Sequence, residues 1–396
     1  MDNLFTVYRA LFGKGDALFQ LFSPYRICPL GAHVDHQGGL VSGFAFDKGI
    51  DFLFSATETG KVEMCSLSFE GLTTFNVQRP VDEKQHNWGD YLRGAVWAMQ
   101  NDFQLKRGIK GLVKGSMPVG GVSSSAALLC GFVMAIAKVN DLQLTQMQVI
   151  EYASKAEREY VGLRNGILDQ ACVVLCQDNK LLYLDTETSQ YELLPFGKGD
   201  SEKLPFEIGI FFSGVTRKLT GTDYNLRVSE CQTAAWTIEA YENIPLKELE
   251  KTRLRDVDEQ LFRKHEQQMP ERFARRARHF YSECNRVKAG VEAWKEGDIK
   301  KFGQLVFESC ESSIHNYECG SKELIAIYEI MRNIDGVYGG RFSGAGFKGA
   351  CIALVDPEKE ASIREQLTRK YLEQFPEYNE TFEIFFCKPC NGVEFM

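Results

Sequence analysis

A glycine-dense loop leads directly into an almost wholly apolar segment, and this junction constrains the fold more than any other feature of the chain. The loop reads "GSMPVGGVSSSAAL" over residues 115–128, and the apolar run continues to Val139. A helix that is apolar nearly all round is buried inside a domain. We therefore expect a core helix that begins near Ser123, with the glycine loop at its N-terminal end.

The same loop predicts phosphate binding. Gly120 and Gly121 let a ligand approach the backbone closely, and a helix N-terminus presents free N–H groups and the positive end of its dipole. The hydroxyls of Ser123, Ser124 and Ser125 can bind a phosphate or a cation. The alternative is a glycine-rich turn with serine caps on a core helix. The loop is not a Walker A motif, because Gly-Lys-Ser/Thr does not occur in the chain.

The length of 396 residues predicts two domains. We place the boundary in the polar stretch 186–204, which gives domains 1–195 and 196–396. Residues 169–185 are expected to form two short strands joined by the polar turn 177–179. A mixture of strands and helices without strict alternation favours α+β domains. The other expected strands are 41–56, 109–115, 206–213, 350–355 and 381–387, and the expected helices include 145–162, 271–297 and 358–374.

Composition excludes some partners and favours a cytoplasmic protein. The net charge is −8, and no Lys/Arg-rich run is present, which argues against nucleic acid and anionic membranes. No secretory signal or membrane-spanning segment is evident. Twelve scattered cysteines, mostly in apolar runs, fit reduced and buried thiols. The single C-x-x-C, Cys387 to Cys390, lacks the second pair that a zinc site needs, and a redox role is disfavoured.

Two carboxylates follow the phosphate loop in "SKAEREYVGLRNGILDQ", residues 154–170. Glu157 is expected on a helix, and Asp169 lies beyond a loop that ends in Gly166. Carboxylates near a phosphate loop can hold Mg²⁺ or accept a hydroxyl proton. The alternative is a solvated glutamate on a helix face and an aspartate in a turn.

Two further stretches are candidates for ligand contact. Five glycines lie between Gly339 and Gly349, more than an ordinary turn needs, which indicates close approach of the backbone to a ligand or to another loop. A bulged β-turn is the alternative. Trp88 and Tyr91 can wall a flat ring, although such a pair is also typical of a core.

Taken in order, these stretches resemble the motifs of the GHMP kinases. "PYRICPLGAHVDHQGG" resembles the first motif in its galactokinase form, "PVGGVSSSAA" the second and "GGRFSGAGFKGAC" the third. "GILDQ", "VTRKLTGTDYNLRVSEC" and "RARHFYSECNRV" are also similar to galactokinase segments. The resemblance runs from about residue 23 to about residue 355. Within the galactokinase family, "YRICPLGAH", "GLRNGILDQ", "YNLRVSEC" and "RFSGAGF" most resemble the wording of galacturonokinases.

The resemblance implies a two-domain α+β fold, with an N-terminal domain like the second domain of ribosomal protein S5 and a ferredoxin-like C-terminal domain. It implies an ATP-dependent and Mg²⁺-dependent sugar 1-kinase that phosphorylates the anomeric hydroxyl of D-galacturonate. The alternatives are a galactokinase acting on D-galactose and a non-catalytic sensor of sugar and ATP. The expected partners are small molecules only, and the expected state is a monomer or weak dimer.

Residue roles follow from the matched motifs. Asp169 matches the catalytic aspartate, which would orient or deprotonate the sugar's C1 hydroxyl, and Arg26 matches the arginine that favours its ionised form. Glu157 and Ser125 match the Mg²⁺ ligands, with Ser124 as the alternative serine. Sugar contacts are implied for Arg26, His33, Asp35, Gly166, Asp169 and Tyr224. ATP contacts are implied for Trp88, Tyr91, Gly120, Gly121, Ser123, Ser124 and Ser125.

The sequence departs from galactokinases in two places. The phosphate loop is one residue shorter, which predicts a local adjustment of the turn. Ala32 replaces the glutamate that contacts the sugar's C6 hydroxyl in galactokinases, and this removes a charge that would repel a C6 carboxylate. Arg164 is the predicted partner of that carboxylate, because an arginine fork pairs with it through two hydrogen bonds. Arg217 and Arg227 are alternatives, as is an incidental Ala32 beside a solvated loop arginine.

Overall fold

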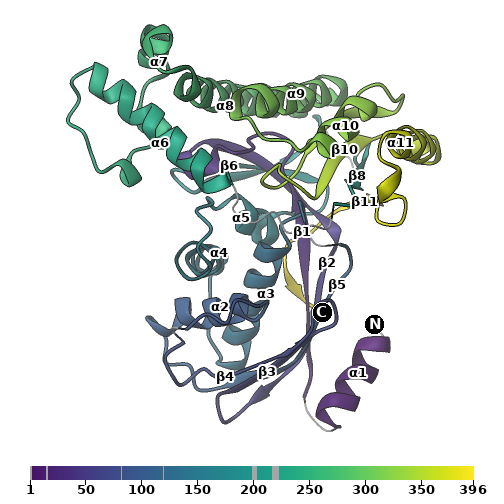
Figure 1. Ribbon diagram of the computed structural model, residues 1–396. Coiled ribbons are helices and arrows are strands. Elements are labelled where there is room, and N and C mark those ends of the chain that lie inside the picture. Colours follow the sequence, from purple (N-terminus) through teal and green to yellow (C-terminus); the bar gives the residue numbers. More distant parts are fainter. Residues whose placement is uncertain (1, 15–16, 82, 119, 199–202, 216–222) are drawn as a thin grey trace.

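A computed structural model describes residues 2–14, 17–81, 83–118, 120–198, 203–215 and 223–396. The first half of the chain forms the lower part of Figure 1, around a long sheet, and most of the second half forms the upper part. The C-terminal end of the chain departs from this division, because the last strands return to the first sheet. The predicted α+β class is confirmed.

The first sheet is organised around β2 (Leu40–Thr57), which has 18 residues. It pairs antiparallel with β1 (Phe19–Ile27) and β5 (Gly108–Gly115), so the strands predicted at 41–56 and 109–115 are confirmed. β3 (Lys61–Ser66) runs parallel to β5. The remaining strands are β4 (Leu72–Asn76), β6 (Lys180–Asp185), β7 (Gln190–Pro195), β12 (Pro389–Cys390) and β13 (Glu394–Phe395).

Two of these pairings bear on the domain division. β7 forms a hairpin with β6 inside the stretch expected as a linker, and β12 and β13 pair with β2 and β1. A division near residue 195 stays a prediction.

Four helices cover one face of this sheet, and α1 (Asp2–Phe12) lies on the other (Figure 1). The core helix is α3 (Ser124–Val139), as predicted. α4 (Gln146–Lys155) starts at a capping box on Thr145 and continues as a π-helical turn, η2 (Ala156–Val161), to a left-handed Gly162, which confirms the predicted helix over 145–162. The others are α2 (Asp90–Gln100) and α5 (Leu168–Leu175).

The prediction of two strands over 169–185 is wrong in its first half. Residues 169–175 belong to α5, and only β6 is a strand. α5 packs against α3, α4 and β1, so its apolar residues are buried on all sides. A short apolar run buried in this way has no periodicity that separates a helix from a strand.

The second sheet is wholly antiparallel, in the order β11-β8-β10-β9. Its strands are β8 (Glu207–Phe212), β9 (Val337–Phe342), β10 (Ala350–Val355) and β11 (Glu383–Cys387), three of which were predicted. α8 (Glu271–Glu296) and α9 (Ile299–Ser312) lie side by side across the top of Figure 1. The other helices are α6 (Asp223–Tyr241), α7 (Glu259–His265), α10 (Lys322–Met331) and α11 (Glu360–Gln374).

Short helical turns join these elements. They are η1 (Asp35–Gln37), η3 (Leu249–Lys251), η4 (Leu254–Asp256), η5 (Glu266–Gln268), η6 (Ser313–Tyr317), η7 (Pro357–Lys359) and η8 (Pro376–Tyr378). Of these, η1 and η6 contribute to the site described below.

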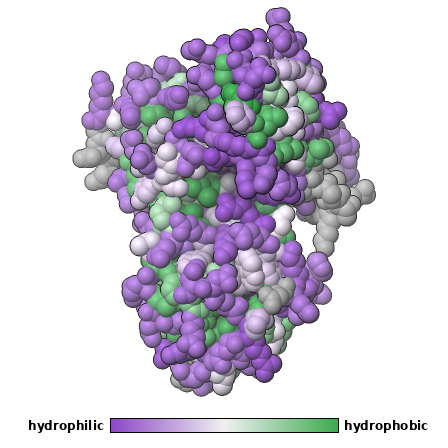
Figure 2. Space-filling model, turned by 90° about the vertical axis from the view of Figure 1, so that its left-hand side faces the viewer, coloured by the Kyte–Doolittle hydropathy of each residue, from purple (hydrophilic) through white to green (hydrophobic). Residues whose placement is uncertain are grey.

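Surface and thiols agree with the composition. The face shown in Figure 2 is mainly hydrophilic, with apolar residues in scattered patches. Within the described ranges, no helix combines the length and apolar character that crossing a bilayer requires. All twelve cysteines are free thiols, and all except Cys65 and Cys390 are buried.

Candidate active site

Two glycine loops from opposite halves of the chain meet at the centre of the molecule. Gly120 and Gly121 precede α3, and Gly344 and Gly349 lie between β9 and β10. All four have positive φ, and a Cβ on Gly349 would lie 2.8 Å from the carbonyl carbon of Gly120. Side chains at this contact would therefore push the loops apart. The close backbone approach predicted for the third motif is to the phosphate loop.

A cavity of about 320 Å³ lies at this junction. It receives residues from β1, η1, α3, α5, α6 and β9, so both halves of the chain build it. Among the predicted residues, the cavity is lined by Arg26, Ala32, His33, Asp35, Tyr91, Gly120, Gly121, Ser123, Ser124, Ser125, Asp169 and Tyr224.

A second cavity of about 560 Å³ adjoins the first. Trp88 and Tyr91 line it together with apolar side chains such as Met117 and Leu128. An apolar cavity with two aromatic side chains suits a flat heterocyclic ring. Tyr91, Ser124 and Ser125 line both cavities, and we refer to the two as the ring cavity and the transfer cavity.

Asp169 is held by two side chains at the floor of the transfer cavity. Its Oδ1 lies 2.8 Å from Nε and 2.7 Å from Nη2 of Arg26, and its Oδ2 accepts a hydrogen bond from Ser123. The Arg26 side chain is 5% exposed and that of Asp169 is 20% exposed. Ser123 has a φ of 55°, uncommon for a residue other than glycine, and its hydroxyl binds Asp169 rather than capping α3.

Glu157 lies on the π-helical turn, behind the lining of the transfer cavity. Its Oε2 accepts hydrogen bonds from Asn165 (2.7 Å) and Gln170 (2.5 Å). Burial, and then the charge of Asp169, raise the pKa of Glu157, while hydrogen bonds from Asn165, Ser125 and Gln170 lower it. The carboxylate therefore stands within reach of the serine run.

The donor set around Glu157 fits a hard cation such as Mg²⁺. Oδ1 of Asn165 and Oε1 of Gln170 are buried, and neither has a hydrogen-bond donor among the residues that the structure describes. Buried acceptors are normally satisfied. With the hydroxyl of Ser125 and the carboxylate of Glu157 they offer only oxygen ligands, which Mg²⁺ prefers.

The far end of the transfer cavity carries the first motif. Burial, and secondarily the charge of Asp169, raise the pKa of Asp35 to about 6. His33 stacks on Tyr317 with ring centroids 4.4 Å apart, and burial together with Arg341 holds its pKa well below the ordinary value. Tyr224 lies at the same end, on the first turn of α6, and burial raises its pKa.

Two predicted sugar contacts lie outside the transfer cavity. Gly166 packs behind Asp35, because a Cβ there would stand 2.5 Å from Oδ2 of Asp35. The Arg164 side chain is 51% exposed and pairs at 3.3 Å with Glu250, in a neighbouring pocket. Arg227 pairs with Glu230 at 2.7 Å and does not line the transfer cavity. Arg217 lies outside the described residues.

Sequence reasoning missed several polar side chains of the transfer cavity, among them Asn165, Arg341, Ser343 and Lys348. Asn165 lies between two predicted residues, while the other three belong to the glycine-dense stretch of the third motif, whose side chains were assigned no role. Arg341 is almost fully buried. A charged side chain inside a glycine-dense loop was the one available signal.

Comparisons with known proteins agree with this geometry. Residues 90–177 match the GHMP kinases N terminal domain, and residues 291–374 match the GHMP kinases C terminal. A galacturonokinase of Arabidopsis thaliana is 41% identical over 376 residues, covering 90% of this chain and 87% of that protein. A galactokinase of Thermococcus kodakarensis is 32% identical, over 94% of this chain and 99% of that protein.

Solved structures are also similar. The structure of Lactococcus lactis galactokinase complexed with galactose aligns with a TM-score of 0.88 at 27% identity, covering 98% of both chains. The mevalonate kinase of Methanococcus jannaschii aligns with a TM-score of 0.65 over 95% of this chain and 99% of that chain, at 16% identity, and so shares the fold.

Proposed function

The chain belongs to the galactokinase family of the GHMP kinases, and we propose on this premise that it is an ATP-dependent 1-kinase of D-galacturonate. The observation that carries the kinase assignment is the position of Asp169. It lines the transfer cavity, where Arg26 and Ser123 fix it, and Ser124 and Ser125 next to Ser123 line both cavities. Phosphoryl transfer depends mainly on such alignment and on charge neutralisation.

Asp169 acts on the hydroxyl that receives the phosphoryl group. Its partly exposed carboxylate accepts the proton of the C1 hydroxyl, and an anomeric hydroxyl is more acidic than an ordinary alcohol. Arg26 fixes the position of the carboxylate through two nitrogens and also donates to Ser343 at 3.3 Å. The free N–H groups at the start of α3 and the two glycine loops bind phosphate oxygens.

The nucleotide and the metal are assigned by fit. Trp88 and Tyr91 enclose the adenine ring in the ring cavity, and Ser124 and Ser125 lie between it and Asp169. Glu157, Ser125 and the two amide oxygens would hold Mg²⁺, which neutralises charge on the phosphates when bound. The contact between Ser125 and Glu157 favours Ser125 over Ser124 as the serine ligand.

Ala32 supports D-galacturonate over D-galactose. It lines the far end of the transfer cavity, where galactokinases carry a glutamate according to the motif. A carboxylate at that position would face a C6 carboxylate of the substrate in a desolvated site, whereas a methyl group leaves room for it. The similarity to a galacturonokinase agrees with this choice. D-galactose is the second candidate, because galactokinases are similar over nearly the whole chain.

The test is a panel of sugars with ATP, with the product identified by NMR. We expect kcat/KM for D-galacturonate to exceed that for D-galactose by at least about a hundredfold. Ala32→Glu should shift the preference toward galactose. Equal or better turnover of galactose by the unmodified protein would make it a galactokinase. If none of the sugars in the panel supports ATP consumption, the result would favour a non-catalytic sensor of sugar and ATP.

We further propose a cytoplasmic location and a monomeric or weakly dimeric state. Twelve free thiols support a reducing compartment. Analytical ultracentrifugation of the purified protein checks the oligomeric state.

A further inference from the structure

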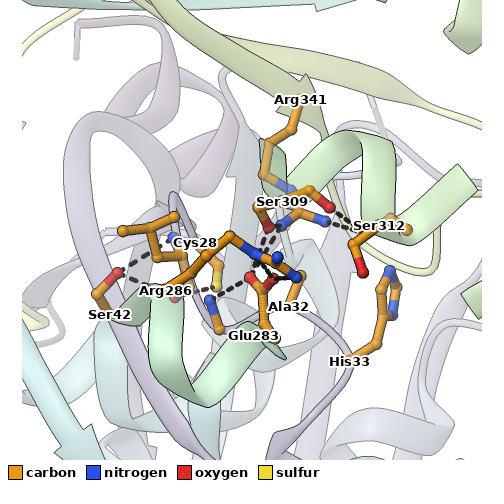
Figure 3. A network of polar contacts seen from close by, with 12 residues as sticks. Cys28, Ala32, His33, Ser42, Glu283, Arg286, Ser309, Ser312 and Arg341 are labelled. Carbon is orange, nitrogen blue, oxygen red and sulfur yellow. Dashed lines mark hydrogen bonds and ion pairs between the residues drawn. The ribbon is translucent and has the colours of Figure 1, made fainter. Parts of the chain in front are cut away.

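A buried network of charged and polar side chains lies directly beneath the far end of the transfer cavity (Figure 3). Glu283 of α8 accepts hydrogen bonds from the backbone N–H of Gly31 (2.8 Å) and from Ser309 of α9 (2.5 Å). Its other oxygen accepts from Nε of Arg286 at 2.7 Å. Arg341 of β9 donates to the same Ser309 and lies 3.7 Å from Glu283. We call these side chains the Glu283 network.

The Glu283 network carries one more positive charge than negative. Glu283 is the only carboxylate, among the residues that the structure describes, within 4 Å of Arg341 or Arg286. Arg286 is partly exposed, but Arg341 is 1% exposed and Glu283 0%. Burial alone would raise the pKa of Glu283, yet Arg286, His279 and Arg341 lower it to about 2, so it is ionised.

The nearby histidines add no charge to the network at neutral pH. Burial lowers the pKa of His33 well below its ordinary value, that of His36 to about 3 and that of His279 to about 4, so all three are neutral at neutral pH. The remaining hydrogen-bond partners of Arg341 are neutral: the hydroxyls of Ser309 and Ser313 and the carbonyl of Phe342. A buried guanidinium without a counter-ion of its own is destabilising.

The position of Arg341 points to the group that completes the network. Arg341 lines the transfer cavity together with Ala32, His33 and Asp169. Its hydrogen bonds to the residues that the structure describes use one N–H on each nitrogen, which leaves one N–H group on each terminal nitrogen. Figure 3 shows the side chain reaching down to Ser309 on the side where Ala32 and His33 lie. Lys348 also lines the cavity, next to the glycine loops at its phosphate end.

We propose that Arg341 determines substrate choice by binding the carboxylate of a uronic acid, and that the substrate supplies the missing negative charge of the Glu283 network. This inference rests on the proposed function and replaces Arg164 as the partner of the C6 carboxylate. A neutral sugar would fill the same space and leave the guanidinium uncompensated. Binding is therefore selective for an anionic sugar. Ala32 removes a negative charge that would repel the substrate carboxylate, and Arg341 supplies a positive charge that binds it.

The experiment compares two arginines that share one glutamate. Arg341→Met removes the cation that lines the transfer cavity, and Arg286→Met removes one that lines a separate pocket on the outer side of α8. We expect Arg341→Met to lower kcat/KM for galacturonate at least about a hundredfold more than for galactose, mainly through KM. Arg286→Met should erode the ratio of the two sugars much less than Arg341→Met, because Arg286 lies outside the transfer cavity and cannot contact the substrate.

A second variant covers a failure of Arg341→Met to fold. Arg341→Lys keeps the charge without the fork, and we expect at least about a tenfold rise in KM for galacturonate relative to galactose. Thermal unfolding monitors the folded state of each variant. Equal losses for both sugars, an unchanged ratio in Arg341→Lys, or equal effects of Arg286→Met would overturn the inference. If the unmodified protein prefers galactose, the proposed substrate fails first; if it prefers galacturonate but the variants keep that preference, only the role of Arg341 fails.

Discussion

The two ends of the transfer cavity use charge in opposite ways. At the phosphate end, Arg26 and Asp169 form a matched pair, with Ser123 on the second carboxylate oxygen. At the far end, two arginines share Glu283 and leave one buried positive charge. A matched ion pair fixes the geometry of a group that can act on any bound sugar. An uncompensated buried cation instead favours the binding of an anionic sugar. Under the proposed function, reaction and substrate choice are therefore separated along one cavity.

The largest effect is expected at the phosphate end, from a change of Asp169. Asp169→Asn keeps the size of the side chain and removes the carboxylate that we propose as the base, so kcat should fall by about a thousandfold for galacturonate and galactose alike. Binding of ATP and of sugar, measured by calorimetry, should change only a few-fold. Activity above about a tenth of the original would remove Asp169 from the catalytic role.

Asp35, at the far end of the transfer cavity, tests whether a buried carboxylate there lowers the stability of the folded protein. Its pKa is about 6 instead of 3.8, because burial disfavours the charged form. The protonated form is thus favoured in the folded state, and its contribution to stability is complete below about pH 4 and lost as the pH rises through about 6. Asp35→Asn should raise the free energy of unfolding at pH 7 by about 3 kcal/mol, with no gain below pH 4.

Urea unfolding at pH 4, 5, 6 and 7 measures this difference. Asp178→Asn, at an exposed position in the turn before β6, is the matched control and should show no such trend. Parallel pH profiles for Asp35→Asn and the unmodified protein would show that Asp35 is not held at an energetic cost. Sugar affinity should fall in Asp35→Asn, which would show that the carboxylate that lowers stability also contributes to sugar binding.

A change of Glu157 tests whether the phosphate end holds Mg²⁺. Glu157→Gln removes a charge that a divalent cation prefers, so the Mg²⁺ concentration for half-maximal rate should rise by about tenfold. Mg²⁺-dependent binding of a non-hydrolysable ATP analogue gives a readout that does not depend on turnover. Glu159→Gln, an exposed glutamate on the same π-helical turn, is the control. An unchanged Mg²⁺ titration would leave Glu157 as a structural residue that orders Asn165 and Gln170.

Much of the phosphate end could be predicted because its signals are local. Glycines before an apolar run predict both the loop and α3, and Thr145 and Gly162 mark the ends of the helix that carries Glu157. α5 was misread because burial on all sides removes the periodicity that identifies a helix.

The far end could be predicted only in part. Gly31 lies in the loop after β1, Glu283 on α8 and Arg341 on β9. Long stretches of chain separate them, and no spacing in the sequence reveals that they meet. Ala32 was readable as a departure from a motif, but the direction of a side chain on a loop is set by its tertiary neighbours. For that reason Arg164, two residues before Gly166, was a reasonable candidate, and its guanidinium nevertheless points to Glu250.

A change of Arg164 has the smallest expected effect. It tests whether the carboxylate site extends into the neighbouring pocket that Arg164 lines. Its pair with Glu250 is exposed on both sides, and such a pair contributes about 0–1 kcal/mol to stability. Arg164→Met should therefore keep the galacturonate-to-galactose ratio of kcat/KM within about twofold of the original, while Arg341→Met erodes it. The same kinetic series measures both variants. If Arg164→Met erodes the preference as strongly as Arg341→Met, the loop over residues 163–166 must turn its arginine toward the bound uronate, and the carboxylate site would then span both pockets that Asp35 separates.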